Sequence, residues 1–303
     1  MPHHRDMVRS PAMAVSCTAP SRDILGESPL WCEQTQSLLW IDIDSATLYR
    51  MHLASGRRDA FRFTARSLGS LALRRAPGSV VLALEASLYT FDFDTGLLTL
   101  LAEVEPAAWN TRLNDGRCDA RGQLWVGTMD NGLTAATGSF YRVGTDGTVM
   151  RHFGDVIVSN TVAISPDQRT LYFSDTRRYV TWAFDLSPED SSLSNRRVFI
   201  DHRAREERPD GACVDIEGGL WVAIFAGGRV DHYTKDGQLE RSIGLPTANP
   251  TCVCLGGPDY RTLFITTAQK FLSAEQLGRE PLAGAVLSVG VDVPGLPEKR
   301  FAA

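Results

Sequence analysis

Short runs of β-branched, aliphatic and aromatic residues recur along the chain, each bounded by clusters of Gly, Asp, Pro or Asn. Runs of this length and composition predict β-strands separated by turns. One unit occurs six times: a turn, a strand with a large apolar residue, and a second short strand. The corresponding apolar positions are spaced by about 42 to 49 residues and are Trp40, Leu82, Trp125, Tyr172, Trp221 and Phe264.

A repeat of this length is typical of a four-stranded β-propeller blade. Because each blade buries its faces against its neighbours, we expect an all-β fold, a six-bladed β-propeller. We expect residues 14–303 to form this single domain and residues 1–13 to form a flexible N-terminal tail. A strand near residues 14–18 should close the ring by pairing with the last strands, and one short helix is predicted near Ser273–Leu277. A β-sandwich with irregular repeats is the alternative, but it gives no reason for six similar units.

Composition restricts the classes of function. The 303 residues are 43% hydrophobic and 22% charged, with a formal net charge of -5, which is ordinary for a globular protein. A mildly acidic chain without a basic stripe argues against nucleic acid as a partner. No apolar stretch is long enough for a transmembrane helix, so we expect no membrane partner. The N-terminus lacks the apolar core of a signal peptide, so we expect a cytoplasmic protein. A closed ring predicts a monomer.

Several common catalytic signatures are absent from the sequence. It contains no glycine-rich or P-loop nucleotide motif, no H-E-x-x-H zinc motif and no G-x-S-x-G nucleophile elbow. Cys252 and Cys254 form a C-x-C pair whose side chains would face the same way on a strand. A metal pair is one interpretation, but we favour two small buried core residues. The six histidines are scattered, which argues against a His-rich zinc site, so any metal would be held mainly by oxygen atoms.

Four polar residues recur at one place in the repeat, just before or within the first strand of a blade. They are Glu27, Asn114, Asn160 and Asp210. In a propeller these segments surround one mouth of the central channel, so residues far apart in sequence converge there. Their side-chain oxygens suit a divalent cation and leave positions for water and substrate. Each residue alone is better explained as a turn or loop residue; their common placement is what indicates a site.

At these residues the chain resembles the gluconolactonase, regucalcin and luciferin-regenerating (senescence marker protein) family. The resemblance spans residues 23 to about 294 and rests on the separated motifs LGESPLW, RLNDGRCDARGQLWVGTM, VSNTVAISPDQRTLYFSDT, RPDGACVDIEGGLWVA and LGGPDYRTLFITTA. Within the family, the sequence is most similar to bacterial sugar lactonases such as xylonolactonase or arabinonolactonase. The resemblance implies a six-bladed propeller that holds one divalent metal ion: Ca²⁺, Zn²⁺, Mn²⁺, Mg²⁺ or Fe²⁺.

The resemblance also implies roles for individual residues. The metal ligands of the family fall on Glu27, Asn160 and Asp210, and all three residue types match. The Arg and Asn that contact the substrate in the family fall on Arg112 and Asn114.

Two departures from the family pattern concern the pocket. Many members have Gly after the metal-binding Asn, where this chain has Thr161. Regucalcin-like members place a substrate-binding Glu shortly after the GTM motif, and this chain has none there. We expect Asp130 and Asn131 to complete the sugar pocket at that point, and the sugar preference stays open.

The expected reaction is hydrolysis of an aldonolactone, such as xylono-, arabinono- or gluconolactone, to the aldonic acid in carbohydrate metabolism. The partner is then a small-molecule sugar lactone. We expect Asp210 to act as general base as well as ligand, and Arg112 and Asn114 to hydrogen-bond the sugar hydroxyls. The alternatives are an organophosphate or aryl-ester hydrolase on the same propeller, and a non-enzymatic propeller that only binds a partner.

Overall fold

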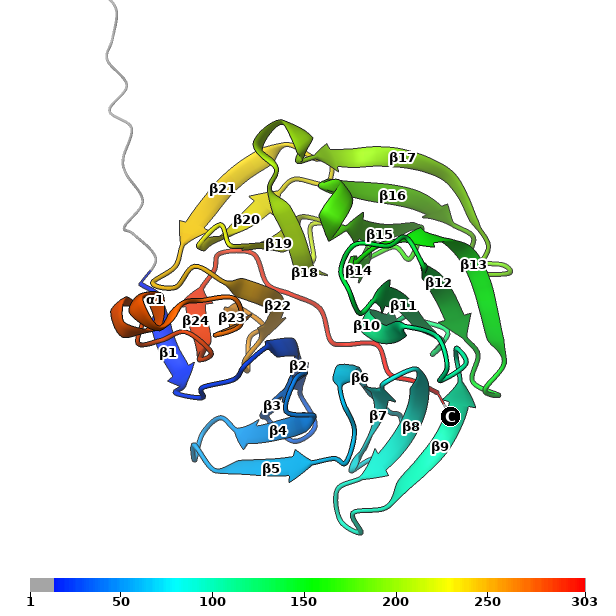
Figure 1. The fold of residues 1–303 in the computed structure, drawn as a ribbon, viewed down its shortest axis with the longest axis horizontal. Coiled ribbons are helices and arrows are strands. Elements are labelled where there is room, and N and C mark those ends of the chain that lie inside the picture. Colours follow the sequence, from blue (N-terminus) through cyan, green and yellow to red (C-terminus); the bar gives the residue numbers. More distant parts are fainter. Residues whose placement is uncertain (1–13, 303) are drawn as a thin grey trace, which may run out of the picture.

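The structure, a computed structural model, describes residues 14–302 and consists almost entirely of β-strands. Six four-stranded antiparallel sheets are arranged around a common centre, as Figure 1 shows. This confirms the all-β, six-bladed β-propeller predicted from the repeat. The expected tail, residues 1–13, lies outside the described residues. Within residues 14–302, no helix is long and apolar enough to cross a membrane.

Each of the first three blades runs outward from the centre in chain order. Blade 1 contains β2 (Gly26–Cys32), β3 (Ser37–Asp42), β4 (Thr47–His52) and β5 (Arg58–Arg62). Blade 2 contains β6 (Leu68–Leu73), β7 (Ser79–Leu84), β8 (Ser87–Asp92) and β9 (Leu98–Glu103). Blade 3 contains β10 (Thr111–Cys118), β11 (Leu124–Asp130), β12 (Gly138–Val143) and β13 (Val149–Val156).

The next blades follow the same order, and the last takes one strand from the N-terminus. Blade 4 contains β14 (Ser159–Ile164), β15 (Thr170–Asp175), β16 (Val180–Leu186) and β17 (Leu193–Asp201). Blade 5 contains β18 (Arg208–Val214), β19 (Leu220–Phe225), β20 (Arg229–Tyr233) and β21 (Leu239–Gly244). Blade 6 contains β22 (Pro250–Gly256), β23 (Thr262–Thr267), β24 (Val286–Gly290) and β1 (Ser16–Ala19).

Three short helical segments lie between strands: the 3₁₀ turns η1 (Thr176–Arg178) and η2 (Arg203–Arg205), and the helix α1 (Ala274–Arg279). The helix is the one predicted near Ser273–Leu277. Ser273 begins it with a capping box, in which its hydroxyl accepts from the backbone N–H of Gln276 and the Gln276 side chain accepts from the backbone N–H of Ser273.

Apolar packing between neighbouring blades holds the ring together. The six predicted repeat positions all lie on second strands and are buried. The core divides into six apolar clusters, each joining residues of two adjacent blades. The cluster between blades 6 and 1 joins Trp31 and Trp40 to Phe264 and Val286, so it completes the circle. Since every sheet buries both faces against another sheet, no blade has an apolar face left over.

Two of the repeats share a polar turn. The carboxylate of Asp119 accepts hydrogen bonds from the backbone of its own turn and from the indole of Trp125, six residues later. Asp215 and Trp221 repeat the arrangement. The indole N–H is thus satisfied within the core, which permits a fully buried Trp.

Both ends of the described chain close the ring. β1 pairs antiparallel with β24, with Ser16 opposite Ser288, as predicted. The segment after β24 crosses the middle of the ring in Figure 1, where it is red. Its last residues are tied to other blades: the backbone N–H of Phe301 donates to the carbonyl of Leu73 in blade 2, and that of Ala302 to Gly122 in blade 3.

Replacing Phe301 with Ala should lower the free energy of unfolding by about 3 to 5 kcal/mol, because the ring is fully buried between blades 2 and 3. Denaturant unfolding measures the loss. Trp109→Ala is the control, because Trp109 is 52% exposed and its loss should change stability by less than about 0.5 kcal/mol. A wild-type midpoint for Phe301→Ala would contradict the role of this segment in closing the ring.

Candidate functional site

Five of the predicted site residues line one cavity at an end of the central channel. Glu27 lies on β2, Arg112 and Asn114 on β10, Asn160 on β14 and Asp210 on β18. Four different blades therefore contribute to it, each through its innermost strand. The cavity volume is about 100 Å³.

A shift in the register of each innermost strand directs these side chains toward the channel end. Between Glu27 and Leu30, between Asn160 and Ala163, and between Pro209 and Ala212, the pairing of the innermost strand with the second strand shifts. The corresponding shift in β10 follows Leu113. A β-bulge bends a strand locally and redirects its side chains. The same irregularity at the same place in each blade thus points polar groups to the channel end.

Thr161, the departure from the family pattern, occupies a strained backbone position. Its φ is 54°, in the left-handed region that Gly adopts without cost and a β-branched residue rarely adopts. The Thr161 hydroxyl donates to the backbone carbonyl of Asp210 at 2.6 Å. The hydroxyl therefore links the strands that carry Asn160 and Asp210, a contact that Gly cannot make.

Hydrogen bonds fix the amide side chains. Asn114 donates from Nδ2 to Oδ1 of Asn160 at 3.0 Å and to the carbonyl of Ser159 at 2.7 Å. Asn160 donates from Nδ2 to the hydroxyl of Thr176 at 2.8 Å. Arg112 donates from one guanidinium nitrogen to Oδ1 of Asn114 at 2.6 Å. The chain of contacts leaves the Oδ1 atom of Asn160 with one free lone pair to offer a ligand.

Two carboxylates share this buried space. Glu27 is 6% exposed and Asp210 is 8% exposed. Burial raises the pKa of Glu27, and the charge of Asp115 raises it further. Burial likewise raises the pKa of Asp210, and the charge of Glu27 adds to the effect. The positive charge of Arg112 opposes both shifts.

This arrangement fits a divalent cation. Two close carboxylates in a low-dielectric cavity repel one another, and a cation between them removes that cost. Their oxygens, with the Oδ1 atom of Asn160, form the hard donor set of Ca²⁺ or Mg²⁺ sites. Among residues 14–302, no cluster of three or more His, Cys, Asp or Glu side chains is placed to hold a metal. The candidate set is therefore two carboxylates and one amide.

The structure places Asp130 and Asn131 away from the cavity lining. The carboxylate of Asp130 accepts hydrogen bonds from the backbone N–H groups of Thr134 and Ala135, and so folds its own loop. Asn131 is exposed. The same segment contributes Met129 and Leu133 to the cavity instead, so its contribution to the lining is apolar.

Other residues that line the cavity are not among the predicted site residues. They include three cations and two aromatic residues: Arg177, Arg208, Lys270, Phe225 and Phe271. Arg208 precedes Asp210 by two positions on β18, and the two-residue period of a strand is a signal for it. Arg177 lies in η1 and Lys270 in a loop, where no periodicity applies.

The two cysteines of the C-x-C pair lie in different surroundings. Cys252 and Cys254 are buried on β22, and all six cysteines are free. Cys254 packs in the core with Trp31 and Phe264. This confirms Cys254 as a small core residue, whereas Cys252 lies against Gly211 of β18 and beside Glu27.

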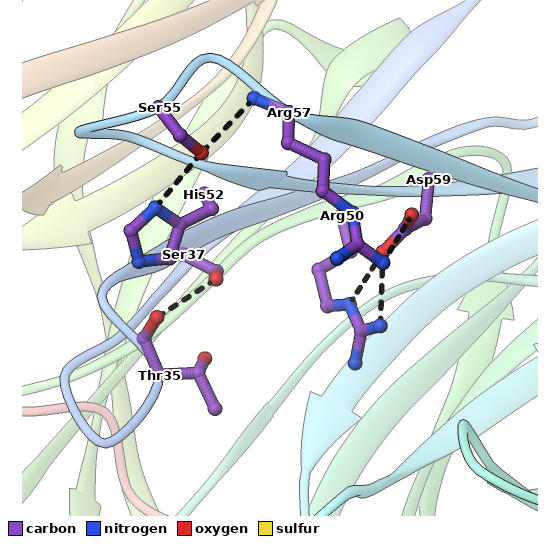
Figure 2. A pocket seen from close by; sticks show the side chains of 7 residues that line it. All are labelled: Thr35, Ser37, Arg50, His52, Ser55, Arg57 and Asp59. Carbon is purple, nitrogen blue, oxygen red and sulfur yellow. Dashed lines mark hydrogen bonds and ion pairs between the residues drawn. The ribbon is translucent and has the colours of Figure 1, made fainter.

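A second hollow lies over the loops and outer strands of blade 1, and Figure 2 shows its lining. It contains none of the predicted site residues. Arg50 pairs with Asp59, its neighbour on the adjacent strand, with an N–O distance of 2.9 Å. Since the guanidinium is already paired, this hollow has less to offer a ligand than the channel-end cavity.

Fold and cavity together define a six-bladed propeller with a polar small-molecule site at one end of its channel. The family described as SMP-30/Gluconolactonase/LRE-like region matches residues 25–269. The chain belongs to this family, as the sequence motifs predicted.

Individual relatives align over nearly the whole chain. A 6-deoxy-6-sulfogluconolactonase from Pseudomonas putida is 38% identical, covering 95% of this chain and 98% of the relative. An L-arabinolactonase from Azospirillum brasilense is 35% identical, covering 96% and 97%. The solved structure of a regucalcin from Agrobacterium tumefaciens, described as a calcium-binding protein, has a TM-score of 0.92 at 30% identity, covering 96% of this chain and 98% of that one.

Proposed function

We propose that this protein is a metal-dependent hydrolase that opens a sugar lactone to the corresponding aldonic acid. The observation that carries the proposal is the meeting of Glu27, Asn160 and Asp210, from three blades, in one cavity with Arg112. The relatives named 6-deoxy-6-sulfogluconolactonase and L-arabinolactonase are lactonases by name, which supports the same class of reaction.

Glu27, Asn160 and Asp210 would hold the metal ion. Their oxygen atoms suit Ca²⁺, Mg²⁺ or Mn²⁺, and open sites of this kind also accept Zn²⁺ and Fe²⁺. When bound, the cation would polarise the lactone carbonyl and stabilise the negative charge that develops on its oxygen. The description of the related regucalcin as calcium-binding supports a divalent cation here.

Asp210 is the proposed general base. A lactone is a cyclic ester, so hydrolysis joins a water oxygen to the carbonyl carbon while Asp210 accepts the proton. The bond between the carbonyl carbon and the ring oxygen then breaks. Asp210 returns its proton to the ring oxygen, which becomes a hydroxyl, and the product is the open hydroxy acid.

Arg112 is the proposed contact to the sugar, and Asn114 holds it in place. Arg112 is anchored by the backbone carbonyl of Leu113 at 3.0 Å and by Oδ1 of Asn114. Asn114 in turn uses its amide nitrogen on Asn160 and Ser159. We therefore assign the sugar hydroxyls to Arg112, and to Asn114 the alignment of Arg112 with the metal ligand Asn160.

Removing the metal should abolish turnover. Chelator-treated protein, verified as metal-free by elemental analysis and as folded by circular dichroism, should release no acid from pentonolactones or hexonolactones. Restoring divalent cations one at a time should restore activity for at least one of them. A folded, metal-free protein that keeps full turnover would contradict the proposal. Hydrolysis of phosphotriesters or aryl esters in place of lactones would assign a different reaction to the same cavity.

Asp210→Ala should lower kcat by at least about 10²- to 10⁴-fold, the usual contribution of a positioned base. Acid release from the best lactone measures the loss, and thermal unfolding checks the fold. Asp259→Ala is a matched control, because Asp259 is an exposed acid that does not line the cavity. Wild-type turnover in a folded Asp210→Ala protein would show that Asp210 is neither base nor essential ligand.

Arg112→Ala should lower kcat/KM about 10- to 100-fold, because a charge-assisted hydrogen bond to the sugar is lost. Steady-state kinetics on the best lactone measures the change. Unchanged kcat/KM would refute the contact between Arg112 and the substrate.

A further inference from the structure

The side chains of two cations at the channel-end cavity have no partner among the described residues. Arg177 and Arg208 both line the cavity and are half-buried. Across residues 14–302, neither guanidinium forms an ion pair, and neither donates a side-chain hydrogen bond. A half-buried guanidinium loses part of its hydration, and without a carboxylate nothing in the free protein compensates for that loss. Both arginines can therefore bind an anion.

Nearby acids are taken by other arginines. Arg178, the neighbour of Arg177, pairs with Asp155 at 2.9 Å. Arg229 pairs with Glu207, close in sequence to Arg208, at 2.6 Å. These pairs leave Arg177 and Arg208 as the free cations of this region.

The remaining cavity cations are engaged. Lys270 contacts Asp44 at 2.8 Å. Arg112 is held against Leu113 and Asn114 and faces the two buried carboxylates. The outer hollow of Figure 2 offers a contrast, because its Arg50 is neutralised by Asp59. The unpaired positive charges of the cavity lining are therefore those of Arg177 and Arg208.

The backbone places these two arginines beside the proposed reaction centre. The Thr176 hydroxyl donates to the carbonyl of Pro209 at 2.7 Å, which ties η1 of blade 4 to β18 of blade 5. Thr176 precedes Arg177, and Pro209 follows Arg208, so the link holds both arginines on one side of the cavity. Thr176 also accepts from Asn160.

The spacing of residues along β18 determines the distance between Asp210, the proposed base, and Arg208. Arg208 and Asp210 are two residues apart on one strand, which separates their Cα atoms by about 7 Å. A six-carbon lactone with its carbonyl at Asp210 can therefore direct its far end toward Arg208.

We propose that the substrate is a sugar lactone with an anionic group at the end remote from its carbonyl, bound by Arg177 and Arg208. This inference rests on the proposed lactonase function and adds the substrate class. A sulfonate, a phosphate and a carboxylate share the required chemistry: each offers oxygens that a guanidinium binds in a bidentate manner. A neutral sugar lactone would leave both guanidinium groups without a charged partner.

The test compares D-glucono-1,5-lactone with its 6-phospho and 6-deoxy-6-sulfo derivatives and with a glucarolactone. We expect at least one anionic lactone to have a kcat/KM at least about 10-fold above that of the neutral one, and the best of the three identifies the anion. A neutral lactone preferred over all three would overturn the inference and leave the lactonase function standing. Hydrolysis of none of them, nor of any pentonolactone, would overturn both.

Arg177→Gln and Arg208→Gln test the residues themselves. Each should lower the ratio of kcat/KM for the anionic over the neutral lactone by about 10- to 100-fold, mainly through KM. Arg178→Gln is the matched control, because Arg178 is paired with Asp155 and does not line the cavity; it should keep the wild-type ratio.

Calorimetry gives a second readout, which does not depend on turnover. Wild-type protein should bind 6-phosphogluconate more tightly than gluconate, and the double variant Arg177→Gln/Arg208→Gln should bind the two alike. A wild-type preference that survives in the folded double variant would refute the assignment.

Discussion

Two carboxylates buried in one small cavity are the constraint on which the site depends. Glu27 and Asp210 lie on different blades, and each is almost removed from solvent. Burial raises the pKa of both carboxyl groups, and the charge of Glu27 raises the pKa of Asp210 further. Asp115, on β10 and also buried, adds a third acidic group, and burial raises its pKa to about 6. In the proposed account, a divalent cation removes this cost and becomes the centre of the reaction.

The propeller makes such an arrangement possible because its stability comes from elsewhere. Six apolar clusters between blades hold the ring, and polar turns such as Asp119 with Trp125 satisfy buried indoles. The channel can therefore contain buried carboxylates that do not stabilise the fold. The far ends of the innermost strands are closed differently: Arg117 there contacts Glu298 of the C-terminal segment and the carbonyls of Val162 and Ala212. One end of the channel is thus filled by the chain itself, and the other is left for a ligand.

The propeller fold and part of the site could be predicted from the sequence, because a sequence repeat indicates a repeated structural unit. The large apolar residues at Trp40, Trp125 and Trp221 identify the second strands, and with them the blades and their number. Polar residues just before or within the first strand of a blade predicted the convergence of Glu27 and Asp210. The position of Asp130 could not be predicted in this way. Its carboxylate accepts hydrogen bonds from the backbone of its own loop, and the repeat pattern carries no information about loop geometry.

The free arginines could not be predicted for a different reason. Arg177 and Arg178 are adjacent in sequence and chemically identical, yet only Arg178 has a carboxylate within reach. Which arginine is neutralised depends on tertiary neighbours such as Asp155, which the sequence does not place. Arg208 begins the motif RPDGACVDIEGGLWVA, and nothing in that motif distinguishes a paired arginine from an unpaired one. Pairing within the fold, and not residue type, decides which charges remain for a ligand.

The central claim is that Glu27, Asn160 and Asp210 share one cation. An anomalous difference map from crystals soaked in Mn²⁺ tests it most directly, because it locates the ion without reference to activity. We predict a single strong peak in the channel-end cavity, about 2.0 to 2.6 Å from an oxygen of each of the three side chains. A peak bound elsewhere, or an empty cavity at saturating Mn²⁺ and Ca²⁺, would contradict the account.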